Sequence, residues 1–171
     1  MIEKPEQNEY NDFYQGYIDR VRTKDIIEFL KTQRKSIVRL FNSIPEERIS
    51  YKYGEDKWSV KQVVRHIIDT EIVFGYRIHS IAKNKGAELP GMDQDMYMDN
   101  SNDTHISFES LIDEFNNVRR GNIAMIENLD PVVYTNMGKA SGFPVSVRAK
   151  IYILAGHAEH HKFILKERYL G

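Results

Sequence analysis

Apolar side chains recur at intervals of three and four residues along five stretches of the chain, which is the spacing of amphipathic helices. The first stretch, residues 10–21, is short and rich in tyrosine, so we expect a short helix that packs on the main body. We interpret its tyrosines as packing residues rather than as residues that stack on a ligand. Four longer helices are expected from Thr23 to Phe41, from Ser59 to Ile81, from Ser107 to Leu129, and from Val145 or Ser146 to Leu165.

The helix that begins near residue 59 has the best-defined start in the sequence. Ser59 and Gln62 match a capping box, and Trp58 and Val63 occupy the positions of a hydrophobic staple. The apolar residues that follow alternate steps of four and three, a seam typical of antiparallel helix bundles. We therefore expect an all-α protein built as a four-helix bundle, with the extra short helix at its N-terminus.

Two stretches carry turn-forming residues instead of a helical pattern. Residues 86–105 are the longest predicted loop, which is either a functional loop or the crossover that lets two neighbouring helices run parallel. Asp93 and Asp95 are candidates to approach a metal ion, but the pattern lacks the glycine and the closing glutamate of an EF-hand calcium loop. Residues 131–146 are expected to form a short extended excursion or only a loop.

The length, charge and cysteine content of the chain limit its domain organisation and the kinds of partner it can bind. The chain has 171 residues, 41% of them hydrophobic, which suits one domain spanning residues 1–171. Its 24 basic and 25 acidic side chains give a net charge of −1, so a small molecule is a more natural partner than nucleic acid or an anionic membrane. The absence of cysteine excludes disulfides, thiolate zinc sites and cysteine nucleophiles. With no signal peptide and no apolar run near the roughly 20 residues of a membrane span, we expect a cytoplasmic protein.

The histidines carry the chemistry that the sequence suggests. His157 and His161 lie about 40° apart on one helix face and can reach the same point. The pair resembles the H-E-x-x-H motif of zinc proteases, but Glu159 is about 200° round from the first histidine, so we set that function aside. Both histidines fall on the apolar stripe of the last helix, and His66 lies beside the inward seam of another. Because a catalytic metal site needs about three protein ligands, we predict that these three histidines bind one metal ion.

Acidic residues near His66 are candidates for proton transfer. Asp69 lies about 60° from His66 on the helix and Thr70 about 40° the other way, so either could touch a group bound by that imidazole. Asp69 could also orient the ring. Glu71 stands where the seam calls for an apolar residue, which predicts either a catalytic role or a buried ion pair with an arginine such as Arg119 or Arg148.

Three segments carry a resemblance to a known family. WSVKQVVRHIIDTE at 58–71, PGMDQD at 90–95 and GHAEHH at 156–161 resemble the DinB-like (DinB/YfiT) superfamily. The resemblance implies an up-down-down-up four-helix bundle with one long crossover, and a divalent metal held by His66, His157 and His161. It also implies a metal-dependent hydrolase or a relative that transfers low-molecular-weight thiols or isomerises maleylpyruvate with a thiol, and dimers are common among such proteins. It does not imply the lesion-bypass DNA polymerases that share the name.

These observations lead to one expected function and two alternatives. A zinc or nickel ion held by three neutral imidazoles would activate water or a low-molecular-weight thiol, with Asp69, Glu71 or Asp93 as the proton carrier. The first alternative is a non-enzymatic module that binds metal or a small molecule. The second is a helical interaction protein whose inward histidines only form hydrogen bonds.

Overall fold

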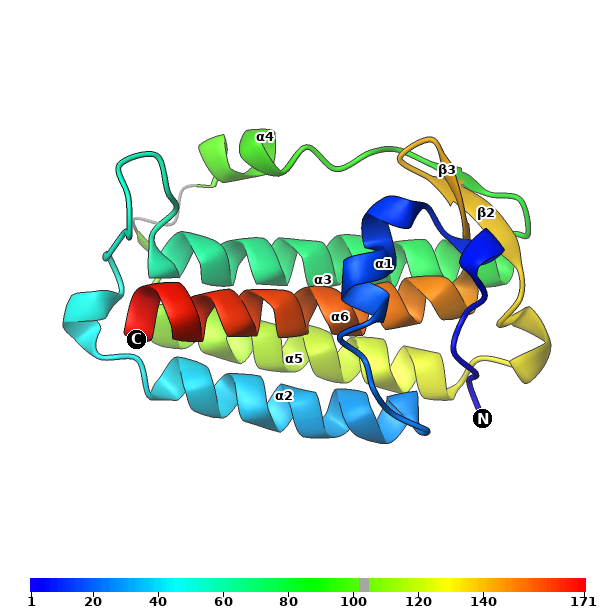
Figure 1. Ribbon diagram of the computed structural model, residues 1–171, viewed down its shortest axis with the longest axis horizontal. Helices are drawn as coiled ribbons and strands as arrows, with labels where there is room; N and C mark the ends of the chain where they lie inside the picture. Colours follow the sequence, from blue (N-terminus) through cyan, green and yellow to red (C-terminus); the bar gives the residue numbers. More distant parts are fainter. Residues whose placement is uncertain (102–104) are drawn as a thin grey trace.

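Four long helices form a bundle in the computed structural model, which describes residues 1–101 and 105–171. They are α2 (Ile26–Asn42), α3 (Val60–Lys83), α5 (Phe108–Glu127) and α6 (Val147–Ile164). Figure 1 shows α2 and α6 running in one direction and α3 and α5 running in the other. The predicted four-helix bundle is confirmed, and its helix order is the up-down-down-up order that the resemblance implied.

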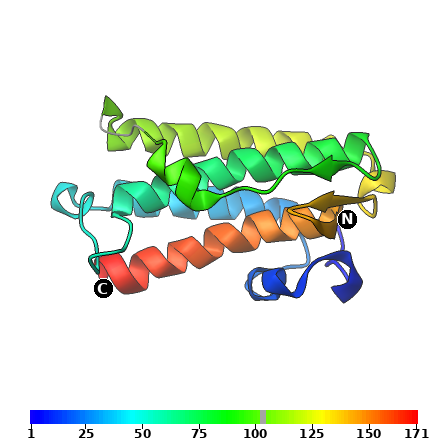
Figure 2. The same cartoon turned by 90° about the horizontal axis from the view of Figure 1, so that it is seen from above.

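The parallel pair α3 and α5 is joined by the long segment between Lys83 and Phe108, which is therefore the expected crossover. It runs back along α3 (Figure 2). The described part of the segment contains a short strand, β1 (Glu88–Leu89), and a short helix, α4 (Gln94–Asp99), where the sequence suggested only turns. Residues 102–104 of this predicted loop lie outside the described residues.

A hairpin closes the end of the bundle at which α6 begins. Strands β2 (Met137–Ala140) and β3 (Phe143–Ser146) pair antiparallel, and β1 pairs parallel with β2. The extended alternative for residues 131–146 is thus confirmed, and the small sheet ties the crossover to the start of α6. The remaining elements are short: η1 (Gln7–Glu9), η2 (Asp12–Tyr14), α1 (Gln15–Ile18), η3 (Glu46–Arg48), η5 (Pro131–Val133) and the π-helical turn η6 (Leu165–Leu170).

Most helix starts are those that the sequence predicts. Ser59 and Gln62 form the reciprocal capping box, with bonds of 3.2 and 2.8 Å, and Ser107 and Ser146 cap α5 and α6. The predicted N-cap of α2, Thr23, was wrong by two residues. Asp25 is the N-cap, and its carboxylate accepts hydrogen bonds from the backbone amides of residues 27 and 28. The Thr23 hydroxyl instead accepts a hydrogen bond from the backbone amide of Asp25, so it helps to hold the N-cap residue in place.

The interior is mainly apolar toward both ends of the bundle, although Arg77 and Lys150 are buried at one of them, and it is polar in the middle. One apolar cluster includes Leu30, Phe74, Ile123 and Leu154, and a second includes Ile37, Ile67, Phe115 and Ala158. Between them, the four helices contribute a layer of buried polar side chains: Gln33, His66, Thr70, Glu71, Arg119 and His157. Among the described residues, no helix combines the length and the apolar character that a bilayer crossing requires.

Candidate metal centre

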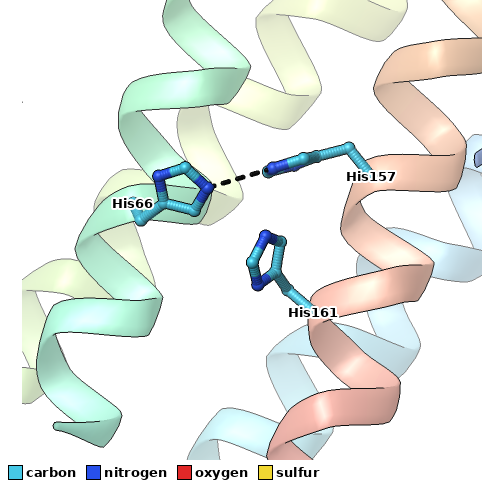
Figure 3. A group of neighbouring side chains, drawn as sticks. All are labelled: His66, His157 and His161. Atoms are coloured by element: carbon cyan, nitrogen blue, oxygen red, sulfur yellow. Dashed lines mark hydrogen bonds between the residues drawn. The ribbon is translucent and has the colours of Figure 1, made fainter. Parts of the chain in front are cut away.

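The three histidines singled out in the sequence meet within this polar layer. His66 projects from α3, and His157 and His161 project from the neighbouring helix α6, so that the rings face one another (Figure 3). One ligand atom from each ring lies within 4.8 Å of the others. The Nε2 atoms of His66 and His157 are 3.1 Å apart. The four-residue spacing on α6 and the packing of α6 against α3 together bring three imidazoles to one point.

Aromatic rings surround this group and hold its orientation. The Trp58 ring centroid is 4.9 Å from that of His66, and the Tyr17 and Phe74 centroids are 5.6 and 5.7 Å from that of His157. Tyr17 comes from α1, which approaches α6 closely. The imidazoles therefore have few ways to reorient, which favours a preorganised site.

Burial keeps all three imidazoles neutral. It lowers the pKa of His66 to about 4, with a smaller contribution from the charge of His160. Burial, together with the neighbouring imidazoles, also lowers the pKa of His157 and of His161 well below the ordinary value. A neutral imidazole offers a lone pair to a metal ion, so the group is ready to act as a ligand set near neutral pH without first losing protons.

The geometry fits a divalent ion. Two imidazole nitrogens on a tetrahedral ion, each about 2.0–2.1 Å from the metal, lie roughly 3.3 Å apart, close to the 3.1 Å between His66 and His157. Within the described part of the chain, Nδ1 of His161 is buried without a hydrogen-bond partner. The group contains three ligating side chains, which leaves at least one coordination position for water or substrate. Such an all-nitrogen set suits zinc, nickel, copper or iron.

Two cavities reach the histidine group. The first, of about 300 Å³, is lined by His66 and His157, and the second, of about 260 Å³, is lined by His161. Gln94, at the start of α4, lines both. A small molecule therefore has access to the histidines, and the crossover contributes to the wall of both cavities.

Comparison with known proteins agrees with this geometry. The model of the DinB superfamily matches residues 30–163. The chain belongs to the DinB superfamily. A protein of Oceanobacillus iheyensis that is named "putative metal-dependent hydrolase" is 26% identical over 148 residues, which cover 84% of each chain. YfiT from Bacillus subtilis, described as a probable metal-dependent hydrolase with an unusual four-helix bundle topology, matches with a TM-score of 0.68 at 14% identity. That match covers 96% of this chain and 90% of YfiT, and it shows the fold.

Two of the three candidate acids of this DinB-superfamily chain are engaged in ion pairs. Glu71 accepts bonds of 2.7 and 2.5 Å from Arg119, so the buried ion pair given as its alternative is present. Asp69 accepts a 3.1 Å bond from Arg65 and lines a separate cavity, which does not contain His66. Arg65 lies one helical turn before Asp69 on α3, a spacing that the sequence shows, whereas the contact of Arg119 with Glu71 depends on the packing of α5 against α3.

The third candidate acid, Asp93, caps α4. Its carboxylate accepts hydrogen bonds of 3.1 Å from the backbone amides of Asp95 and Met96. Its neighbours on both sides, Met92 and Gln94, line the first cavity, and Asp95 lines the second one together with His161. The crossover thus approaches the histidines as the sequence suggested, but with Asp95 rather than Asp93 on a cavity wall.

Other residues of the site were missed in the sequence. Tyr14 and Tyr17 pack against the apolar core, as the sequence suggested, and they also line the first cavity. Thr70, which the helical spacing placed near His66, lines the same cavity. Arg77 does so as well, and its position on the same face of α3 as His66 is the feature of the sequence that identifies it.

Proposed function

We propose that His66, His157 and His161 bind one divalent metal ion, zinc or nickel, and that the chain is a metal-dependent hydrolase or thiol S-transferase. The single observation that carries the proposal is the convergence of three neutral imidazoles with ligand atoms within 4.8 Å of one another, beside a cavity. The name of the Oceanobacillus relative supports the hydrolase branch. A cytoplasmic location and a homodimer stay predictions from the sequence.

The chain's own residues would provide ligands, shielding and a proton carrier. When bound, a divalent ion lowers the pKa of a coordinated water or thiol and so supplies a nucleophile near neutral pH. Tyr17, Trp58 and Phe74 shield the imidazoles from solvent on several sides. Of the candidate acids, Asp95 lies on the wall of the cavity that contains His161, and we assign it the proton-transfer role in place of the arginine-bound Asp69 and Glu71.

Metal analysis tests the ligand assignment. Protein purified without an affinity tag from metal-replete cells should contain about one metal ion per chain, and His157→Ala should lose it. His160→Ala is the matched control, because this adjacent histidine is only half-buried and its ring packs on Tyr17. Wild-type protein without metal would refute the proposal and favour histidines that only form hydrogen bonds.

Turnover separates the two reactions from each other and from the non-enzymatic alternative. Metal-loaded protein is incubated with simple esters and amides, and separately with cellular thiols and a chromogenic electrophile. Hydrolysis without any thiol requirement selects the hydrolase, and thiol-dependent loss of the electrophile selects the transferase. Bound metal with no turnover of either kind favours a binding module.

A further inference from the structure

The first cavity extends from the histidines along α3 to a buried arginine. His66, Thr70, Phe74 and Arg77 all line it. Their spacing of four, four and three residues places them on one face of α3, over about 16 Å of helix axis. The cavity therefore has a histidine end and an arginine end on the same helix.

Arg77 is a buried cation with no acidic partner in residues 1–101 and 105–171. Its side chain is almost fully buried, at 2% exposure. Its hydrogen bonds, from Nη2, go to the carbonyl oxygen of Pro90 at 2.6 Å and to the hydroxyl of Ser141 at 3.4 Å. No Asp or Glu in the described ranges lies within 4.0 Å of the guanidinium. A buried charge normally requires a counter-charge, so this end of the cavity favours an anion.

A second buried basic side chain, Lys150, lies beside the same aromatic ring as Arg77. The Lys150 ammonium nitrogen lies 3.4 Å from the centroid of the Phe74 ring, and the Arg77 guanidinium carbon lies 5.8 Å from the same centroid. Burial and the charge of Arg77 both lower the pKa of Lys150. A lowered pKa disfavours the protonated amine of Lys150, so Arg77 provides the positive charge at this end of the cavity, and no acid in the described part of the chain is among the groups that shift either pKa.

The middle of the cavity offers one polar atom and aromatic walls. The Oγ1 atom of Thr70 is buried and has no hydrogen-bond partner in the described part of the chain. Buried hydroxyls are rarely left unpaired, so this atom points to a missing ligand or water. Phe74, Tyr14 and Tyr17 provide flat apolar surface on the cavity wall.

We infer that the cavity binds a small organic acid, whose carboxylate pairs with Arg77 while its apolar body lies against Phe74 and Tyr14. This inference rests on the proposed function, because the reactive group of such an acid would face His66 and His157, which line the same cavity. The planar guanidinium matches a carboxylate or a phosphate in a bidentate manner. At about 300 Å³ the cavity is at the small end of ligand pockets, which favours the smaller, singly charged carboxylate.

Calorimetry on metal-free protein tests the inference with phenylacetate, its neutral analogue phenylacetamide and phenyl phosphate. Wild-type protein should bind phenylacetate at least tenfold more tightly than phenylacetamide, and Arg77→Met should abolish that difference. Arg168→Met, which changes an exposed arginine, is the control and should keep it. The inference is overturned by equal binding of the acid and the amide, or by a preference that survives Arg77→Met. Tenfold tighter binding of phenyl phosphate would overturn the choice of carboxylate.

Side-chain NMR provides a second test of contact between the ligand and Arg77, and this test does not require that Arg77→Met folds. Phenylacetate should shift the Nε–Hε resonance of Arg77 in the wild-type protein, assigned by comparison with Arg77→Lys, and leave that of Arg168 in place. No shift, or no binding by metal-free and metal-loaded protein alike, would overturn the inference. The measurement uses metal-free protein, so it does not depend on the proposed function. If the chain binds phenylacetate but never takes up metal, only the proposed function is refuted.

Discussion

Glu71 on α3 and Arg119 on α5 form an ion pair whose side chains are 2% and 0% exposed. Arg119 also donates to the amide oxygen of Gln33 on α2, and Gln33 donates to the carbonyl oxygen of Ala155 on α6 at 2.8 Å. One connected set of bonds therefore crosses all four bundle helices beside the histidine group. Because each helix is fixed to the others at this level, the network stabilises the relative positions of α3 and α6, on which the histidine geometry depends.

Glu71→Gln should lower the free energy of unfolding by about 3–5 kcal/mol, because it leaves the Arg119 charge buried without its carboxylate. Urea unfolding measures this loss. Glu127→Gln is the control, since the ion pair of Glu127 with Lys31 at 2.6 Å is exposed at the surface and should contribute less than about 1 kcal/mol. Equal losses in the two variants would show that the buried pair does not have the structural role assigned to it.

Metal-free protein should lose stability as the pH falls from 6.5 toward 4. The pKa of His66 is about 4 in the folded protein and 6.5 ordinarily, so the unfolded chain takes up a proton first. The stability linked to this shift, roughly 3 kcal/mol, is complete above pH 6.5 and disappears as the pH approaches 4. The free energy of unfolding, measured with urea at pH 7 and at pH 4.5, should therefore change less between the two pH values in His66→Gln than in the wild type. His79→Gln, which alters an exposed histidine of the same helix, should match the wild type.

The start of α3 and the histidine pair could be predicted because both depend on local spacing. The capping box joins Ser59 to Gln62 within one helical turn, and His157 and His161 share a face of α6 whatever surrounds it. The position of His66 opposite them followed from its place beside an inward seam. Short-range geometry thus predicted the helices and the three candidate ligands.

The walls of the site could not be predicted in the same way. Gln94 reaches both cavities because the crossover folds back along α3, and Tyr17 reaches His157 because α1 packs on α6. The pairing of Glu71 with Arg119 rather than with Arg148 depends on which helices are neighbours. Each contact joins segments far apart in the sequence, so no local pattern identifies it.

Gly156→Ala should displace α1 from α6. A Cβ atom at this position would lie 2.0 Å from the carbonyl oxygen of Tyr17, and because that atom belongs to the backbone, the helix itself must move. We expect a loss of about 1–3 kcal/mol in the free energy of unfolding and faster proteolysis of the N-terminal segment. Gly121→Ala, in α5 with nothing within 4 Å of its added Cβ, should instead raise the free energy of unfolding by about 0.5–1 kcal/mol. An intact N-terminal segment in Gly156→Ala would contradict the close packing of α1.

Trp58 should report metal binding, because it is the only tryptophan of the chain and its ring centroid lies 4.9 Å from that of His66. A nickel ion has a partly filled d shell and quenches an excited indole at this range, whereas zinc has a filled shell and should not. Titration of metal-free protein with nickel should therefore lower the fluorescence to a plateau at about one ion per chain, and prior addition of zinc should prevent the loss. His157→Ala should remove the plateau, while His160→Ala should keep it. Quenching that zinc does not block would place the nickel ion elsewhere and argue against a site shared by the three histidines.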